Sequence, residues 1–289
     1  MGKGVHLPSN EAITSNELVA ALYQSLLLRD GDNSGVADKS ARLDAGKIDV
    51  AGLIREFMKS SEFLERLPEI LYASGHSGGQ RFTNDVSQYG EIWELLKLMT
   101  RDGGTQPVVV DVGARGRERS NSYDLLRHFG WSGFLVEANP ALIDQINREF
   151  ADLNVTCVCC AVSDYDGTAT LTLGVNADVS SLTEGNALDW GPSPGTVTVT
   201  VRRLPDLLDE AGISHDIGLL SLDIEGEDIK VLNDLIGNSQ YRPRYIIIEA
   251  SNDFKVTSLD DAPFSAAVKD LYQIRAQTRA NLILSRITR

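Results

Sequence analysis

Residues 108–120 read VVVDVGARGRERS, an apolar run followed by a turn that contains two glycines. Its opening apolar run is rich in β-branched residues, as is typical of a strand that is buried on both faces. The turn after it contains Gly113 and Gly116, and a helix is predicted over 120–129. Ligands of an open parallel sheet bind beyond the carboxyl ends of its strands. We therefore expect Asp111 and Gly113 to lie beside a ligand.

Outward from this unit, apolar runs alternate with amphipathic segments as far as the end of the chain. This alternation predicts an α/β fold, in which a doubly wound, mostly parallel sheet is covered by helices on both faces. The predicted strands are 108–112, 133–137, 155–160, 168–173, 197–202, 217–223, 244–249, 271–277 and 281–286. The predicted helices of this part are 120–129, 140–150, 204–211, 227–236 and 264–270.

The N-terminal part has a different pattern, which predicts a small all-helical accessory module and a linker over 1–80. Thr14 and Glu17 have capping-box spacing, and apolar residues recur at helical intervals after them and again over 49–67. Two short amphipathic helices would thus flank a polar turn, RDGDNSGVADKS (29–40). The stretch SGHSGG (74–79) predicts the linker, EIWELLKLMT (91–100) predicts a helix, and the second domain is expected over 81–289.

The polar turn has the beginning of a calcium-binding loop but not its end. Asp30, Asp32 and Ser34, with Gly35, fit the start of an EF-hand loop. Such a loop needs a bidentate acid at its twelfth position, which is Ala41 here. We therefore interpret the segment as a capped turn.

Composition excludes several classes of function. The net charge of −14 argues against nonspecific binding of nucleic acid or of anionic membranes. No apolar stretch is long enough to span a bilayer, and the N-terminal stretch has no apolar core of a signal peptide. Cys157, Cys159 and Cys160 form neither a disulfide framework nor a zinc motif, and we interpret them as small apolar residues on a buried strand. These features predict a cytoplasmic protein.

The next predicted strand ends in Glu137, within FLVEANP (134–140). A carboxylate at that place can accept hydrogen bonds from both hydroxyls of a ribose. Dinucleotide enzymes need a G-x-G-x-x-G turn for the pyrophosphate, and the turn with Gly113 and Gly116 lacks it. S-adenosylmethionine has no pyrophosphate, and Asp111 suits its sulfonium and ammonium groups. This cofactor is therefore favoured, and a nicotinamide-dependent oxidoreductase is the alternative.

Five blocks in sequence order resemble the FkbM-type family of S-adenosylmethionine-dependent methyltransferases. They are DVGA, FLVEANP, AVSDYDGTATL, LSLDIEGED and RPRYIIIEAS, within residues 108–251. The resemblance implies a Rossmann-like, seven-stranded class I methyltransferase fold. Arg115 and Arg117 replace an Asn and a Gly of the family pattern. The cofactor site that the resemblance implies consists of Asp111, Gly113, Ala114, Arg115, Glu137, Ala138 and Asn139, with Ser163 and Asp164 beside the adenine.

Residues 15–66 resemble a small helical repeat module of unassigned function that occurs in many bacterial surface and sugar-modifying proteins. The resemblance rests on LYQSLLLRD (22–30) and FMKSSEF (57–63). It implies a docking or accessory role and no chemistry.

The stretch LLSLDIEGEDIKVL (219–232) contains the candidate catalytic acids. If the chain stays extended after the strand, Asp223 and Glu225 point the same way. Neighbouring carboxylates repel each other and are typical of functional sites. Asp223 is the first candidate for the base that removes the acceptor proton, and Glu225 is the second. Asp223 and Glu249 end adjacent strands and could hold one divalent cation, a question that the sequence leaves open.

These residues predict an O-methyltransferase, and the resemblance implies that its acceptor is a hydroxyl of a sugar, glycolipid or polyketide-like metabolite. The polar segment 173–195, which contains Trp190, is expected to form a lid on the acceptor side. Besides the oxidoreductase, a catalytically silent scaffold protein that docks partners through the helical module is an alternative.

Overall fold

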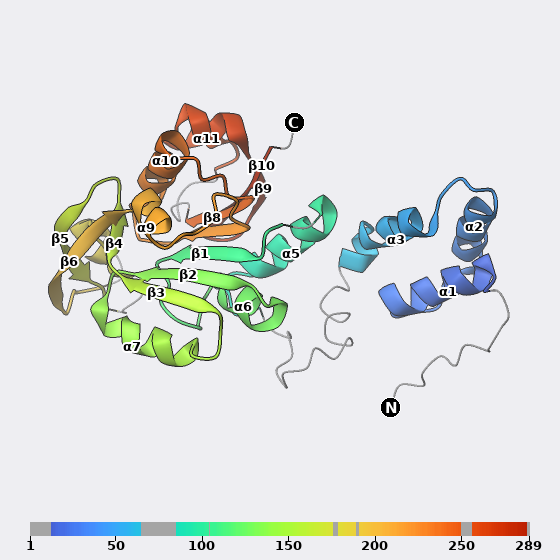
Figure 1. The fold of residues 1–289 in the computed structure, drawn as a ribbon, viewed down its shortest axis with the longest axis horizontal. Coiled ribbons are helices and arrows are strands. Elements are labelled where there is room, and N and C mark those ends of the chain that lie inside the picture. Colours follow the sequence, from blue (N-terminus) through green and yellow to red (C-terminus); the bar gives the residue numbers. More distant parts are fainter. Residues whose placement is uncertain are drawn as a thin grey trace. The chain divides into compact units, whose positions relative to one another are not determined.

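The computed structural model describes residues 13–64, 85–103, 105–175, 179–188, 191–249 and 256–287 (Figure 1). The predicted linker at 74–79 and Trp190 of the predicted lid lie outside these residues.

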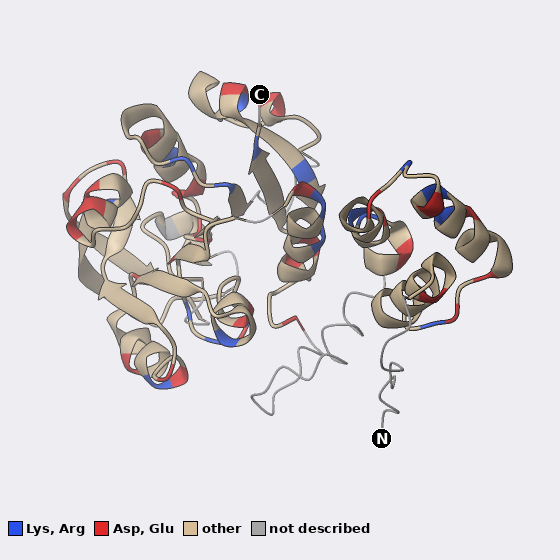
Figure 2. Ribbon diagram, turned by 45° about the vertical axis from the view of Figure 1, so that its right-hand side comes forward, with Lys and Arg blue, Asp and Glu red and all other residues tan. Residues whose placement is uncertain are grey.

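Charged residues are distributed over the helices of the whole chain (Figure 2). The full sequence has 41 acidic and 27 basic side chains, so acidic residues are in excess. No helix in the described ranges combines the length and the apolar character that crossing a bilayer requires.

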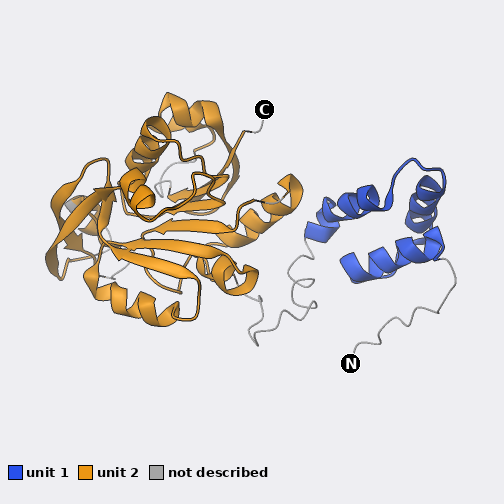
Figure 3. Ribbon diagram, in the orientation of Figure 1, with its two compact units in different colours: residues 1–83 blue, residues 84–289 orange. Residues whose placement is uncertain are grey.

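Contacts divide the chain into two compact units, residues 1–83 and residues 84–289 (Figure 3). Unit 1 contains α1 (Ser15–Leu26), α2 (Asn33–Asp44) and α3 (Val50–Met58). The capping box of Thr14 and Glu17 begins α1, as expected. Tyr23 and Phe57 are buried in the core of this unit, and their ring centroids lie 4.9 Å apart in an edge-to-face arrangement.

The structure corrects the prediction for residues 29–40, because most of this segment is helical. Asp32 is the N-cap of α2 and accepts a hydrogen bond from the backbone N–H of Gly35 at 2.7 Å. The capped turn is thus confirmed, but the helix that follows it was missed. Its only buried residue is Ser40, so α2 has no apolar stripe by which sequence periodicity could identify it.

Unit 2 is built on a seven-stranded sheet with the order β3-β2-β1-β7-β8-β10-β9. The first five strands run parallel, and β10 is antiparallel to both of its neighbours (Figure 1). The α/β class and the seven-stranded, mostly parallel sheet are confirmed. In sheet order, the strands are β3 (Val155–Cys159), β2 (Ser132–Glu137), β1 (Val108–Val112), β7 (Leu219–Leu222), β8 (Tyr245–Glu249), β10 (Asn281–Arg286) and β9 (Tyr272–Gln277).

Helices cover both faces of this sheet (Figure 1). One layer consists of α5 (Glu91–Asp102), α6 (Tyr123–Phe129) and α7 (Pro140–Glu149), and the other of α9 (Leu204–Glu210), α10 (Asp228–Asn238) and α11 (Ala266–Leu271). Between the sheet and the second layer lies a continuous apolar core, in which Val110, Leu220 and Ile246 are fully buried. The order of the strands reverses between β1 and β7. A crevice at their carboxyl ends is therefore the expected ligand site of such a sheet.

A second, three-stranded sheet has the order β4-β6-β5. Its strands are β4 (Ala161–Ser163), β5 (Gly167–Leu173) and β6 (Gly195–Arg203). The sequence predicted β5 and β6 but not that they leave the main sheet. The predicted strand 155–160 also differs, because β3 ends at Cys159 and β4 begins two residues later. The prediction of a buried strand is wrong, because β3 is an edge strand of the main sheet and none of its residues is fully buried. Cys157 is half-buried and Cys159 is exposed, whereas Cys160, which follows the strand, is buried.

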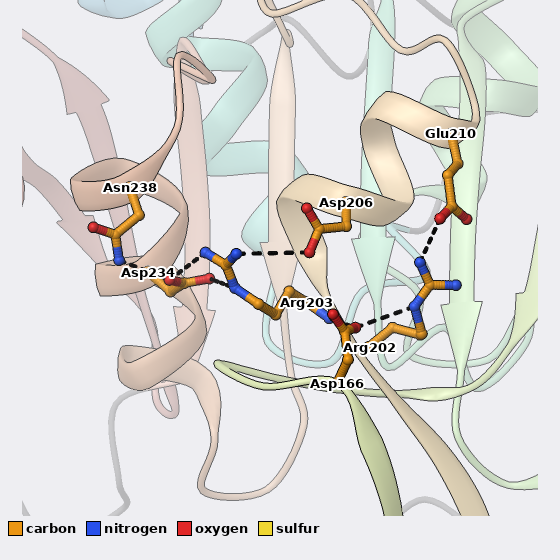
Figure 4. Close-up of polar contacts among 7 residues, drawn as sticks. All are labelled: Asp166, Arg202, Arg203, Asp206, Glu210, Asp234 and Asn238. Atoms are coloured by element: carbon orange, nitrogen blue, oxygen red, sulfur yellow. Dashed lines mark hydrogen bonds and ion pairs between the residues drawn. The ribbon is translucent and has the colours of Figure 1, made fainter.

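Charged hydrogen bonds connect the second sheet to α9 and α10 (Figure 4). Arg203, at the end of β6, donates to both carboxylate oxygens of Asp234 on α10, at 2.8 and 3.1 Å. Arg202 donates to Glu210 at the end of α9 at 2.6 Å and to Asp166 at 3.2 Å. These contacts fix β6 against the helix layer that covers the main sheet.

Candidate functional site

Two cavities lie at the carboxyl ends of the central strands of unit 2. The first has a volume of about 160 Å³ and is lined by side chains that include Asp111, Asn121 and Glu249. The second, of about 50 Å³, is lined by side chains that include Glu137 and Val162. Both cavities share four residues, which are Gly113, Arg115, Asp223 and Glu225. The expected switch point of the sheet is therefore the place where the two cavities meet.

Gly113 allows β1 and β7 to approach each other at this point. Its φ is +90°, and a Cβ there would lie 1.9 Å from the backbone oxygen of Asp223. The backbone N–H groups of Gly113 and Ala114 both donate to Val136 O, at 2.9 and 3.1 Å, and so hold the turn against the end of β2. The close approach predicted at Gly113 is thus made to the protein backbone, at a residue that also lines both cavities.

Asp111 lies almost fully buried in the wall of the first cavity, with 4% of its surface exposed. The Ser122 hydroxyl donates to its carboxylate at 2.5 Å. Burial raises the pKa of Asp111 above its usual value, and the serine contact opposes that shift. A cationic group in the cavity would therefore stabilise the ionised carboxylate.

Asn121 is a buried residue of the first cavity that the sequence analysis did not identify. Its amide N–H donates to the Ser221 hydroxyl at 3.2 Å. Its Oδ1 atom is buried and has no hydrogen-bond partner within the described part of the chain. A buried acceptor without a partner is costly, so the position of Asn121 in the wall of the first cavity is maintained by its other contacts. The polar run SNS (120–122) after the glycine turn was the available signal.

Glu137 ends β2 and lines the second cavity together with Ala138. The backbone N–H of Asn139 donates to its carboxylate at 2.6 Å. Burial raises the pKa of Glu137 to about 7. Asn139 itself caps α7, because its side chain accepts from the Ala141 N–H, and it lines neither cavity.

The residues expected beside the adenine follow directly after the wall of the second cavity. That wall contains Cys160, Ala161 and Val162. Ser163 is buried and donates to the Glu227 carboxylate at 2.5 Å, whereas Asp164 is exposed. Neither of them lines a cavity. The apolar residues just before Ser163 are therefore the ones that face the site.

Carboxylate oxygens of Asp223, Glu225 and Glu249 lie within 4.8 Å of one another, which would suit a metal ion. Burial and the charge of Glu249 raise the pKa of Asp223 well above its usual value. Burial and the charges of Asp228 and Glu225 raise the pKa of Glu249 to about 8. The cluster therefore attracts protons or a cation.

The backbone after β7 differs from the extended chain that the sequence analysis assumed. Glu225 has a φ of +55°, which is in the left-handed region. The Asp228 carboxylate accepts hydrogen bonds from the N–H groups of Ile224 and Gly226, at 2.9 and 3.0 Å. The chain thus turns sharply at Glu225, and this turn, rather than strand alternation, brings its carboxylate beside Asp223.

Part of the predicted lid segment lines the site. Val179 faces the first cavity, and Ser180 and Leu182 face the second. The segment is anchored by paired backbone hydrogen bonds between Ser181 and Thr172 on β5.

A family model described as methyltransferase FkbM domain matches residues 111–266, which is more than half of the chain and includes the residues shared by both cavities. A model described as domain of unknown function (DUF4214) matches residues 8–67. No curated protein matches the sequence.

Proposed function

The chain belongs to the FkbM methyltransferase family, and from this premise we propose that it methylates a hydroxyl of a sugar, glycolipid or polyketide-like acceptor. The family implies S-adenosylmethionine as the methyl donor. The observation that carries the proposal is the meeting of the two cavities at Asp223 and Glu225. In this arrangement the second cavity takes the adenosine part, and the first takes the methionine part and the acceptor.

The residues present fit this donor. Glu137 is placed to accept hydrogen bonds from the ribose hydroxyls, beside an apolar wall for the adenine that contains Ala161 and Val162. The ammonium group can donate to the carboxylate of Asp111, which lines the first cavity.

When bound, S-adenosylmethionine supplies an electrophilic methyl group and becomes S-adenosylhomocysteine. The protein must align the acceptor oxygen with that methyl group, exclude water and remove the hydroxyl proton. We assign the last role to Asp223, at the junction of the cavities, and an orienting role to Glu225. A nearby sulfonium charge lowers the pKa of the Asp223 carboxyl, which favours the ionised form that accepts a proton.

The acidic cluster supports a second, separate proposal, in which a divalent cation binds to Asp223, Glu225 and Glu249. Carboxylate oxygens are the ligands that Mg²⁺ and Ca²⁺ prefer, and such a cation would lower the pKa of an acceptor hydroxyl. Treatment with a chelator should reduce methyl transfer, and Mg²⁺ should restore it. Full activity after exhaustive chelation would exclude the cation without affecting the assignment of the methyl donor.

We also propose that unit 1 serves for docking and that the protein is cytoplasmic. The match of residues 8–67 to a domain of unknown function is compatible with an accessory role. The only cysteines of the sequence are Cys157, Cys159 and Cys160, whose odd number and adjacency do not make a disulfide framework, and this supports a reducing compartment.

Labelled methyl donor incubated with glycolipid, polysaccharide and polyketide fractions tests the proposed reaction. We expect the protein to transfer label to one of these fractions, and mass spectrometry should show the gain of one methyl group on oxygen. Hydride transfer to or from a nicotinamide cofactor would favour the oxidoreductase instead. Absence of both reactions and of any donor binding would favour the scaffold protein.

A further inference from the structure

Glu225 has a backbone conformation that its residue type rarely adopts. A φ of +55° is natural for glycine but is strained for a residue with a side chain. Such strain persists only where surrounding contacts hold it. At this position the strained residue also carries one of the three clustered carboxylates.

Two side chains of the lid segment hold the carbonyl group of Glu225. The Ser181 hydroxyl donates to Glu225 O at 2.7 Å, and the Asn186 amide donates to the same oxygen at 2.8 Å. Asn186 is also packed closely against the next residue, because a Cβ on Gly226 would lie 2.1 Å from its Nδ2 atom. Two side chains of the lid segment thus hold the turn through the carbonyl oxygen of Glu225.

Ser181 is itself held in place. It is 1% exposed, and its backbone N–H and C=O groups both pair with Thr172, at 3.0 and 2.9 Å. Its hydroxyl also accepts from the Thr183 N–H at 2.9 Å. The second sheet therefore fixes the donor that reaches Glu225.

The N–H groups on either side of Glu225 are held by a different element. Asp228, at the start of α10, accepts from Ile224 N and Gly226 N. Four hydrogen bonds from two separate elements thus hold the backbone around a single residue that lines both cavities. Neighbours of Ser181 line these cavities, since Val179 faces the first and Leu182 the second.

We propose that Ser181 and Asn186 are positioning residues, which hold the Glu225 carboxylate at the junction of the cavities and so favour the positively charged methyl donor. The inference rests on the proposed function. Without the two donors, only Asp228 holds the turn, so we expect the strained conformation of Glu225 to relax and its carboxylate to move away from the junction. S-adenosylhomocysteine lacks the sulfonium charge, so its affinity does not depend on this carboxylate in the same way.

A double-mutant cycle tests the inference, with dissociation constants of S-adenosylmethionine and S-adenosylhomocysteine measured by calorimetry. Asn186→Leu retains the volume of the side chain and removes the donor, and Glu225→Gln removes the charge. Each should lower the preference for S-adenosylmethionine over S-adenosylhomocysteine by about threefold or more, as expected for losing one nearby charge. The double variant should lose no more than Glu225→Gln alone, because Asn186 acts through Glu225.

Ser193→Ala is a matched control, since it removes another hydroxyl that donates to a backbone carbonyl, that of Gly195, at 2.8 Å. It should leave the preference unchanged. Ser181→Ala provides a second cycle if Asn186→Leu does not fold. The inference would be overturned if the losses of preference from the two single substitutions multiplied in the double variant of both cycles. An unchanged preference in Asn186→Leu would also overturn it. If the unmodified protein binds neither compound, the proposed function itself fails.

Discussion

Asp223 is the residue whose side chain has the most direct chemical role in this account. It follows β7 directly and lines both cavities. Asp223→Asn keeps the shape of the side chain but removes the proton acceptor. We expect methyl transfer to fall by about 100-fold or more, in the range that general bases contribute, while affinity for S-adenosylhomocysteine changes little.

Asp144→Asn is the control for this substitution, because Asp144 is an exposed acid on α7 that lines neither cavity. It should retain full transfer. Comparable activity of Asp223→Asn and the unmodified protein would remove Asp223 from its assigned role.

The buried acids also predict how stability depends on pH. Folding raises the pKa of Glu137 to about 7 and that of Glu249 to about 8, above the usual value of 4.5. The folded protein therefore binds more protons than the unfolded chain between about pH 4.5 and 8. Their stabilising contribution is complete below pH 4.5 and is lost as pH rises through this window.

Denaturant unfolding of the ligand-free protein at pH 5.5 and pH 8 measures this effect. We expect the free energy of unfolding to be lower at pH 8, with a smaller difference in Glu249→Gln. Since one pKa unit corresponds to about 1.4 kcal/mol, the change should be on the order of 1 kcal/mol or more. Higher stability at pH 8 would contradict the burial of these acids.

The sequence identifies site residues that end a predicted strand, but not those whose position depends on tertiary contacts. Asp111 and Glu137 could be placed because each is at the end of a predicted strand. The left-handed turn at Glu225 could not, because it depends on donors from Ser181 and Asn186, about 40 residues earlier. The buried Oδ1 of Asn121 likewise follows from packing rather than from local pattern.

At the scale of elements, the connection of β6 to α10 predicts a measurable effect on stability. Arg203 forms a bidentate ion pair with Asp234, whose side chain is 7% exposed. Arg203→Ala leaves this buried carboxylate with the Asn238 amide as a remaining donor (Figure 4). We expect the free energy of unfolding to fall by about 1–3 kcal/mol, the usual cost of an under-satisfied buried charged group.

Arg55→Ala is the matched control, because Arg55 and its partner Asp49 are exposed and 4.0 Å apart. Chemical denaturation should show a change within about 0.5 kcal/mol for this variant. Equal effects of the two substitutions would mean that the network does not stabilise the junction of the second sheet.

Strands and helices with a strong apolar period were predicted closely. The structure has β1 over Val108–Val112 and α7 over Pro140–Glu149, within a residue of the predicted bounds. The pattern could not show that β4, β5 and β6 form their own sheet, since strand pairing is a long-range property. It also missed α2, which is polar on nearly all sides.

At the scale of the whole molecule, both cavities belong to unit 2 and are lined by residues of that unit. We therefore expect a protein without residues 1–83 to bind S-adenosylhomocysteine as tightly as the full chain and to methylate a dissolved acceptor at the same rate. Calorimetry and a transfer assay would check this. A loss of donor binding in the shortened chain would show that unit 1 contributes to the site.

We propose that the turn after β1 and the acid that ends β2 bind the methyl donor. Calorimetric titration with S-adenosylhomocysteine, of the unmodified full chain and of its Glu137→Gln variant, tests this binding. A titration of the unmodified chain with NAD is the comparison. We expect one molecule of S-adenosylhomocysteine to bind per chain and NAD to give no heat. Glu137→Gln should bind at least about tenfold more weakly, because hydrogen bonds to a charged group are lost. Absence of binding by the unmodified protein, or binding that Glu137→Gln leaves unchanged, would contradict it.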